Sequence, residues 1–528
     1  MSRSETASMF PALAVFLLIS TATVVTSGQD QIPVKVFVLA GQSNMQGQAV
    51  IDLDHEEHYN GGRGILNTVM TDPGNQPAMN HLRNRRGEWK VRRDVFIRYR
   101  TDEELKKGGL TIGFTGYGGQ HHFGPELQFG HVVGHAFDEP VLLIKTAWGG
   151  KSLQTDFRPP SSGGETGPYY QKMLDEVEEA FEAIDEEFPE LAGRPRELAG
   201  FVWMQGWNDM VSEEAATEYE DNLVNLINDL RSHWDKPGLP VIVGELGNGG
   251  DDVSDGMQRL RAAQRAACER EDNGGSVVFV PTAQHARPAE DSPNTTHGHH
   301  WFGNAESYFY IGHDLGAAMV DLIHGDKPRV LILGDSISIG YTRHVRRLLA
   351  DDAIVIRPTL NLDGAENCEG TKKGIDHIER WLELDGGDWD VIHFNFGLHD
   401  MKHVDPETGR NSNDPAHPEQ SPPDRYREQL EEIVSKLKAT GAELIFATTT
   451  PVPEGGVRPF RDPQMIARYN EIALEIMAAN EVSVNDLNGL VLPQMDSLMR
   501  PVDVHFTPEG STTLAAQVAE KIKEALER

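Results

Sequence analysis

The chain has 528 residues and a formal net charge of -34, from 82 Asp and Glu residues against 48 Lys and Arg residues. This length exceeds what one hydrophobic core usually organises, so we expect two domains. A surface this acidic repels nucleic acid and anionic lipid, which excludes both as expected partners. The two cysteines, Cys268 and Cys368, are too few for a disulfide framework and are expected to be free thiols.

The N-terminus has the pattern of a secretory signal peptide. Arg3 precedes an apolar run over residues 9–25, and the small residues 26–28 follow as a cleavage site. We therefore predict a signal peptide over residues 1–28 and a secreted or periplasmic protein, with no membrane association after cleavage. The alternative is an uncleaved membrane anchor.

Short apolar strands alternate with longer helical segments along the first half, the pattern of βαβ units on a parallel sheet. Strands are predicted at 34–40, 141–147, 199–204, 241–245 and 276–280, and helices at 169–188, 214–233, 258–270 and 305–323. The stretch from about residue 50 to residue 139 is polar and Gly-rich, and we interpret it as a long insertion.

The segment "HGDKPRV" (324–330) ends the last of these helices and opens a new strand, so we place a domain boundary near residue 326. The second half repeats the alternation more compactly. Its strands are predicted at 329–333, 353–356, 391–395, 443–447 and 482–484, and its helices at 339–350, 371–384, 424–440, 463–480 and 508–527. The repeated order of motifs predicts two copies of one fold, at 31–325 and 327–528.

Each half opens with a strand that ends in Gly-x-Ser. "VFVLAGQSNMQGQ" presents Ser43 and "RVLILGDSISIG" presents Ser336. A serine directly after a parallel strand lies at the carboxyl edge of the sheet, where open α/β folds bind ligands. If a helix follows, its free N–H groups can stabilise an oxyanion. By itself, however, a single Gly-x-Ser is more often a strand-terminal turn.

A nucleophilic serine also needs a base and oxyanion donors, and both halves offer candidates at other strand ends. "WMQGWND" (203–209) and "AWGGKS" (147–152) supply an amide and backbone N–H groups in the first half. "FNFGLHD" (394–400) ends a strand in the second half, and "DVHFTPEG" (503–510) places His505 just before the last helix.

Together these motifs resemble the SGNH/GDSL hydrolases. "GDSISIGYT", "GLHD" and "DVHFTPEG" resemble the spaced blocks of that superfamily, and "GQSNMQG", "KTAWGGKSL" and "WMQGWND" resemble its sialate O-acetylesterase/acetylxylan esterase branch. The resemblance implies two three-layer α/β/α domains of flavodoxin-like fold, each with a central parallel sheet. It also implies that no metal or cofactor is required.

In the first domain, the resemblance implies Ser43 as the nucleophile, with Gly149, Gln205 and the Ser43 amide as its oxyanion hole. The base is expected within residues 294–306, with His300 preferred and His297 as the alternative. The superfamily usually places an Asp three residues before its histidine, but His297 occupies that position here. The acid is therefore expected from Asp209 or from Asp291, unless the site works as a dyad.

In the second domain, the resemblance implies Ser336 as the nucleophile and His505 as the base. Asp503, the candidate acid, lies only two residues before His505. The glycine of the oxyanion hole maps to Gly364 or Gly370, and the side-chain donor to Asn395 or His399. "GLHD" places a histidine, His399, where the family normally has Asn.

We therefore predict a secreted serine esterase that removes O-acetyl groups from carbohydrate, either an acetylated polysaccharide or sialic acid, through an acyl-enzyme. One alternative is a lipolytic esterase for longer acyl chains, which the polar character of the insertion disfavours. Another is a carbohydrate-binding protein with one or both sites inactive. A zinc site formed by His297, His299 and His300 is a further alternative, for which no carboxylate or cysteine partner is evident. The sequence leaves open the sugar, the hydroxyl and the oligomeric state.

Overall fold

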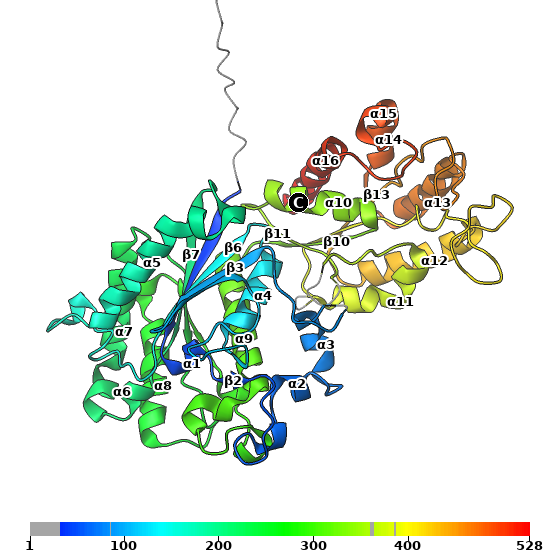
Figure 1. Ribbon diagram of the computed structural model, residues 1–528. Helices are drawn as coiled ribbons and strands as arrows, with labels where there is room; N and C mark the ends of the chain where they lie inside the picture. Colours follow the sequence, from blue (N-terminus) through cyan, green and yellow to red (C-terminus); the bar gives the residue numbers. More distant parts are fainter. Residues whose placement is uncertain (1–31, 85, 360–363, 385–386) are drawn as a thin grey trace, which may run out of the picture.

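The computed structural model describes residues 32–84, 86–359, 364–384 and 387–528. The signal peptide predicted over residues 1–28 lies outside the described residues. Two separate sheets organise the chain, and Figure 1 shows them as two lobes. We call them the N-terminal domain, with seven strands, and the C-terminal domain, with five. The predicted boundary near residue 326 falls between the last helix of the first and the first strand of the second.

The sheet of the N-terminal domain has the order β4-β3-β6-β1-β7-β8-β9. Its strands are β1 (Val34–Gly41), β3 (Val95–Arg100), β4 (Leu105–Gly109), β6 (Val141–Ala147), β7 (Arg196–Met204), β8 (Val241–Gly244) and β9 (Val277–Val280). All pair in parallel except β4, which pairs antiparallel with β3. A small two-stranded sheet joins β2 (Ala49–Val50) and β5 (His122–Phe123).

The C-terminal sheet is parallel and has the order β11-β10-β12-β13-β14. Its strands are β10 (Arg329–Leu333), β11 (Ile354–Ile356), β12 (Val391–Phe394), β13 (Glu443–Ala447) and β14 (Ser483–Asn485). Renumbered along the chain this is 2-1-3-4-5, the flavodoxin-like order. The strands β6-β1-β7-β8-β9 repeat that order in the N-terminal domain, so the two halves share one topology.

Helices cover both faces of both sheets, which gives two three-layer α/β/α units (Figure 1). In the N-terminal domain the longer helices are α4 (Glu126–Ala136), α5 (Pro168–Glu187), α7 (Glu213–His233), α8 (Asp255–Cys268) and α9 (Ala305–His324), and the short ones are α1 (Ser43–Gln46), α2 (Leu66–Val69), α3 (Gln76–Met79) and α6 (Trp207–Met210). In the C-terminal domain they are α10 (Ser336–Leu348), α11 (Thr371–Leu382), α12 (Pro423–Lys438), α13 (Met465–Ala479), α14 (Leu487–Val491), α15 (Met495–Leu498) and α16 (Pro508–Leu526).

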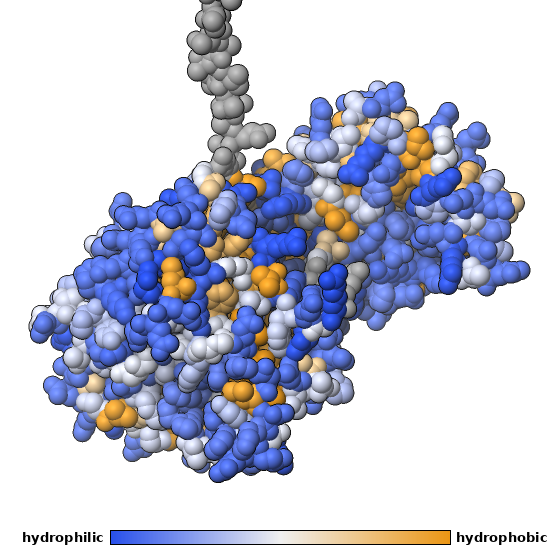
Figure 2. Space-filling view, viewed as in Figure 1, coloured by the Kyte–Doolittle hydropathy of each residue, from blue (hydrophilic) through white to orange (hydrophobic). Residues whose placement is uncertain are grey.

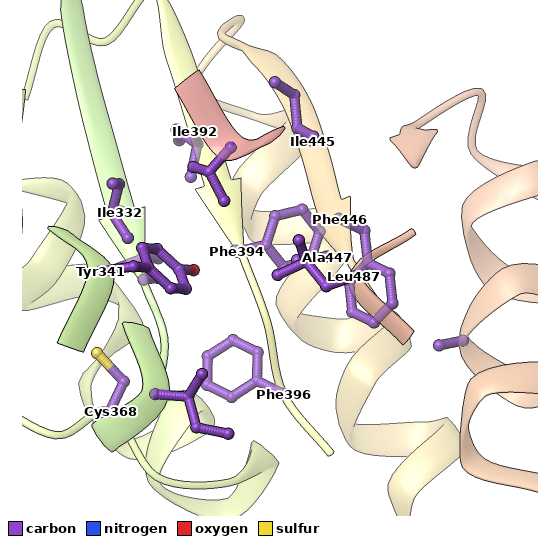
Figure 3. Packing of buried hydrophobic residues seen from close by; sticks show 14 of the residues in the cluster. Ile332, Tyr341, Cys368, Ile392, Phe394, Phe396, Ile445, Phe446, Ala447 and Leu487 are labelled. Carbon is purple, nitrogen blue, oxygen red and sulfur yellow. The ribbon is translucent and has the colours of Figure 1, made fainter. Parts of the chain in front are cut away.

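The period of two along β1 builds the N-terminal core. Val36 and Val38 belong to a buried cluster that includes residues of α5, α7 and α8, whereas Phe37 and Leu39 belong to a cluster that includes residues of α4 and α9. Because successive side chains point to opposite faces, a strand with apolar residues on both faces contributes to both layers of the core. The C-terminal domain has one buried cluster, and Figure 3 shows aromatic and aliphatic residues of β10, β12 and β13 packed within it. The cysteines are free, as predicted, and both are buried.

The interpretation of residues 50–139 as an insertion without sheet strands was wrong. This stretch contains β3, which pairs in parallel with β6 in the main sheet, and α4, which packs against α9. Arg98, in the middle of β3, is 1% exposed and pairs with Glu187 at 2.8 Å. Because arginine is usually exposed, a strand that contains a buried arginine has the sequence pattern of a polar surface segment. The pattern of apolar residues therefore did not predict β3.

The two domains meet at the amino edge of the N-terminal sheet. Asp138 lies just before β6 and accepts hydrogen bonds from two arginines of α10. Arg343 donates to its backbone carbonyl at 2.6 Å, and Arg346 to its carboxylate at 3.4 Å. Within the described ranges, no helix combines the length and apolar character that spanning a bilayer requires.

Candidate active sites

Ser43 is the first residue of α1 and lies at the carboxyl edge of β1. The turn that presents it depends on Gly41, whose φ of +152° favours glycine. A Cβ at Gly41 would meet the carbonyl oxygen of Met204 at 2.1 Å, so no other residue fits there. The serine is thereby held against the end of β7, between the central strands of the sheet.

His300 reaches this serine from the segment before α9. Its Nε2 lies 3.0 Å from the Ser43 Oγ, so the preferred histidine and serine meet although 257 residues separate them. The two residues after His300, Trp301 and Phe302, have φ of +53° and +54°. Bulky residues in this left-handed region are strained, and such strain persists only where the surroundings impose it.

Three buried polar residues hold the backbone of this loop. Asn44 and Asn248 both donate side-chain hydrogen bonds to the carbonyl of His299, at 3.1 and 2.6 Å. Tyr308 donates to Asn44 at 2.7 Å and to the His300 carbonyl at 3.5 Å. These three residues were not predicted from the sequence, although Asn44 stands inside the quoted "GQSNM" motif.

His300 has no carboxylate within ion-pair distance anywhere in the described ranges. The neighbours of its ring are His299 and His297, with ring centroids 4.0 and 6.5 Å away. Burial lowers the pKa of His300 to about 4, and the two neighbouring histidines act in the same direction. The imidazole is therefore neutral at pH 7, as a general base must be. Of the described residues, no group of three or more His, Cys, Asp or Glu is placed to hold a metal.

Asp209, one of the two expected acids, accepts a hydrogen bond from Gln205 and not from His300. It is fully buried, accepts a hydrogen bond from the Gln205 amide at 2.6 Å, and accepts two more from the backbone N–H groups of Leu153 and Gln154. Burial raises its pKa to about 6 against these hydrogen bonds. Asp291, the other candidate, lies on the short helical turn before the histidine loop, and its carbonyl accepts from Asn304.

Gln205 is not free to donate to an oxyanion in this conformation. Its amide nitrogen donates to Asp209 and to the Lys151 carbonyl, and its oxygen accepts from Tyr219. Gly149 does lie beside the nucleophile, since a Cβ added to it would be 3.7 Å from the Ser43 Cβ. No described residue accepts a hydrogen bond from the backbone N–H of Gly149 or of Ser43. These two N–H groups are therefore the available oxyanion donors.

A buried ion pair contacts the C-terminal end of α1. Lys145 and Glu126 have side chains that are 0% exposed and lie 2.8 Å apart. Lys145 also donates to the carbonyl of Gln46 at the end of α1, and Glu126 accepts from the backbone N–H of Gly124. A charge pair without solvent is stable only with such further hydrogen bonds.

The C-terminal domain repeats the arrangement and adds an acid. Ser336, the first residue of α10, has its Oγ 3.0 Å from the His505 Nε2. The His505 Nδ1 lies 2.7 Å from the carboxylate of Asp503, which also accepts from the His505 backbone at 3.2 Å. Burial alone would raise the pKa of Asp503, but the hydrogen bonds from His505 outweigh it and lower the pKa. The carboxylate therefore stays ionised and fixes the orientation of the imidazole.

The expected donors of the second site lie at the same sheet edge but are engaged differently. Asn395 donates its side-chain amide to the Ala447 carbonyl at 2.7 Å, which ties it to β13. His399 is largely buried, and among the described residues its Nδ1 has no hydrogen-bond partner, although the Glu369 carboxylate lies 3.9 Å from it. Burial lowers the pKa of His399 to about 3, and the charges of Lys402 and Arg461 act in the same direction. A neutral imidazole can donate one N–H, as an Asn amide would.

The two candidate glycines of this site have different surroundings. The backbone N–H of Cys368 donates to the Gly334 carbonyl at 3.1 Å, so the segment leading to Gly370 lies against the turn of Ser336. Gly370 also has the Asp400 carboxylate within 3 Å of where its Cβ would be. Gly364, in contrast, lines a cavity between the two domains.

Comparisons with known proteins match both halves. The family described as carbohydrate esterase, sialic acid-specific acetylesterase matches residues 33–319, and the GDSL-like lipase/acylhydrolase family matches residues 332–512. A curated relative from Arabidopsis thaliana, named "Probable carbohydrate esterase At4g34215", is 26% identical over 251 residues, which cover 46% of this chain and 80% of the relative.

Two solved structures are also similar. The X-ray structure of the Arabidopsis thaliana protein AT4G34215 is 19% identical, with a TM-score of 0.36, and covers 55% of this chain and 98% of its own. A lipase/acylhydrolase from Enterococcus faecalis is 22% identical, with a TM-score of 0.30, and covers 37% of this chain and 96% of its own.

Proposed function

Because the chain belongs to the carbohydrate esterase family of sialic acid-specific acetylesterases, we propose that it removes O-acetyl groups from carbohydrate through a serine acyl-enzyme. The observation that carries this proposal is the pair of Oγ–Nε2 distances of 3.0 Å, from Ser43 to His300 and from Ser336 to His505. Each pair lies at the carboxyl edge of its own sheet, where α/β folds bind ligands.

In the proposed reaction the Ser43 Oγ attacks the carbonyl carbon of the acetyl ester. The His300 Nε2 takes the serine proton and passes it to the sugar oxygen as the ester C–O bond breaks. The backbone N–H groups of Ser43 and Gly149 hold the oxyanion, at roughly 3–4 kcal/mol for each such donor. Water then attacks the acetyl-serine with His300 as base, which releases acetate and restores the serine.

The same sequence of steps applies to Ser336 and His505, where Asp503 stabilises the imidazolium that forms. His399 is the proposed side-chain donor to the oxyanion, because its ring is neutral and Asn395 is engaged by β13. We further propose that the protein is secreted, since the family acts on carbohydrate and the first 28 residues have the pattern of a signal peptide.

The test is acetate release from acetylated xylan and from O-acetyl sialic acid by the wild type, Ser43→Ala, Ser336→Ala and the double variant. Ser232→Ala is a control, because this exposed residue lies near the end of α7, before the amino end of β8. We expect each single variant to lose one component of the activity and the double variant to lose all of it. Full activity in the double variant would rule out the serine mechanism.

A second candidate function is a carbohydrate-binding role for the N-terminal domain alone. Two observations favour it: His300 has no carboxylate partner among the described residues, and both amide hydrogens of Gln205 are engaged. In that case Ser43→Ala would leave acetate release unchanged, and binding of deacetylated xylan would persist in the same variant.

A further inference from the structure

A cavity of about 540 Å³ lies between the two domains, away from Ser43. Its walls include residues just before β3 and β6, the end of α4, the middle of α10 and the segment that follows β11. The volume is within the range of roughly 300–1,000 Å³ typical of small-molecule sites. Figure 2 shows hydrophilic residues in the hollow between the two lobes.

The lining of this cavity is basic, in contrast to the chain as a whole. Six basic residues line it against the three acidic residues Asp94, Asp138 and Glu139, whereas the whole chain carries a net charge of -34. The basic residues are Lys90, Arg92, Arg93, Arg343, Arg346 and Arg357. A concave surface of one sign concentrates ligands of the opposite sign.

Two of these arginines are not neutralised by a carboxylate. Arg357 is 4% exposed and donates only to uncharged oxygens, at Ser338, Thr342, Gly334 and Glu366, all through its Nη atoms. Its Nε is buried and has no partner. Arg93 is exposed and forms no ion pair with any described residue. The buried Nε has no accessible surface through which a ligand could contact it, so Arg357 contributes its positive charge to the cavity. The exposed Arg93 guanidinium can bind an anion directly.

The other arginines are partly compensated, which gives the cavity a defined shape. Arg92 pairs with Asp94 at 2.8 Å, and Arg343 and Arg346 share Asp138. The positive charges of Arg92 and Arg346 also act on His135, which lines the same cavity. Burial is the main cause that lowers the pKa of His135 to about 4, and the charges of Arg346 and Arg92 act in the same direction.

We propose that this interdomain cavity binds the anionic group of an acidic oligosaccharide, such as the carboxylates of uronic acid residues. The anion is bound directly by Arg93 and is attracted by the buried charge of Arg357. The cavity adjoins the second active site: Arg357 contacts the Gly334 carbonyl two residues before Ser336, and Arg343 lies roughly 10 Å along α10 from that serine. The sugar part of the ligand rests on the proposed function, whereas the anion recognition does not.

Calorimetric titration of the Ser43→Ala/Ser336→Ala variant tests this independently of catalysis. The probes are trigalacturonate, neutral xylotriose and sodium sulfate. The proposal expects trigalacturonate to bind with an affinity that falls as salt rises, and xylotriose not to bind at this cavity. Binding of sulfate alone would overturn the oligosaccharide assignment, and absence of binding by any anion would overturn the site.

Arg93→Glu locates the binding, with Arg347→Glu as its matched control. Both replace an exposed arginine, so they change the net charge equally, and Arg347 lies outside this cavity on the same helix as Arg343. We expect Arg93→Glu to weaken trigalacturonate binding about tenfold or more and Arg347→Glu to leave it unchanged. Equal weakening by both variants would mean a general effect of charge and would overturn the proposal. The milder Arg93→Gln repeats the test if Arg93→Glu does not fold.

Discussion

Asp503 accepts a hydrogen bond from the Nδ1 of His505 at 2.7 Å, and nothing equivalent stands beside His300 among the described residues. The two serine–histidine pairs have the same separation, so the acid is the main geometric difference between the sites. Ser336, His505 and Asp503 have the arrangement of a triad, whereas Ser43 and His300 form a pair flanked by histidines. This difference makes the two sites separable by experiment.

Asp503→Asn, made in the Ser43→Ala background, should lower kcat of the second site by about 10³–10⁴-fold. When the NH₂ group of the introduced amide side chain faces the ring, it cannot accept a hydrogen bond from the His505 Nδ1–H. The imidazole then loses both its fixed orientation and the negative charge beside it. Acetate release with saturating substrate measures the effect. The matched control is Asp291→Asn in the Ser336→Ala background, because this carboxylate contacts neither histidine. A fall of less than tenfold in Asp503→Asn would contradict the assigned role.

The N-terminal site should remain active in mildly acidic solution. His300 acts as a base only when neutral, and its pKa is lowered to about 4, so activity is retained as pH falls from 7 and is half lost near pH 4. The profile of kcat/KM against pH for the Ser336→Ala variant measures this limb. Replacing His299 and His297 by Gln removes their positive charges at low pH, so the limb should then move to higher pH. A limb near pH 6.5 in the Ser336→Ala variant would contradict the burial of this imidazole.

Lys145→Met should destabilise the N-terminal domain by about 3–5 kcal/mol, because it leaves the Glu126 carboxylate buried without a partner. Glu126→Gln/Lys145→Met should cost less than the single Lys variant, since no buried charge remains. Urea unfolding followed by tryptophan fluorescence measures the free energies. If the double variant were less stable than Lys145→Met, the cost would come from lost packing and hydrogen bonds instead of from an unpaired charge.

His399→Ala, in the Ser43→Ala background, should lower kcat of the second site by about 10²–10³-fold, with little change in KM, as expected for the loss of an oxyanion donor. His399→Asn places the residue usual in the family and should keep activity near that of the wild type. Because burial lowers the pKa of His399 to about 3, the effect should not vary between pH 5 and pH 8. Equal losses in the Ala and Asn variants would contradict donation by this side chain.

The sequence predicted the sheet strands that are apolar on both faces and the serines at their ends. Those strands are buried in three-layer units, and a Gly-x-Ser turn after a strand is a local feature. It did not predict β3, because Arg98 is buried only through its pairs with Glu179 and Glu187, which come from a helix some 80 residues later. Pairings of this kind are set by tertiary structure and leave no local pattern.

The same reason limits what could be predicted of the sites. Ser43 and His300, like Ser336 and His505, could be named because each follows a strand or precedes a helix at one sheet edge. The sequence could not predict that Asp209 accepts a hydrogen bond from Gln205. A carboxylate four residues after Gln205 can be oriented either toward its amide or toward His300, and tertiary structure decides between them. The structure brings each serine and its histidine together, but the catalytic roles of all the predicted site residues remain predictions: Ser43, His300, Gln205, Gly149, Ser336, His505, Asp503, His399 and Asn395.

The contact between Asp138 and α10 has a consequence for how substrates reach the two serines. Asp138 is at the amino edge of the N-terminal sheet and Ser43 at the carboxyl edge, so the length of β6 separates them by roughly 20 Å. A mono- or disaccharide that leaves one pocket must cross bulk solvent before it enters the other. For short substrates the turnover numbers of the two sites should therefore add, without channelling, whereas a long polymer could engage both at once and be deacetylated at two distant positions in a single encounter.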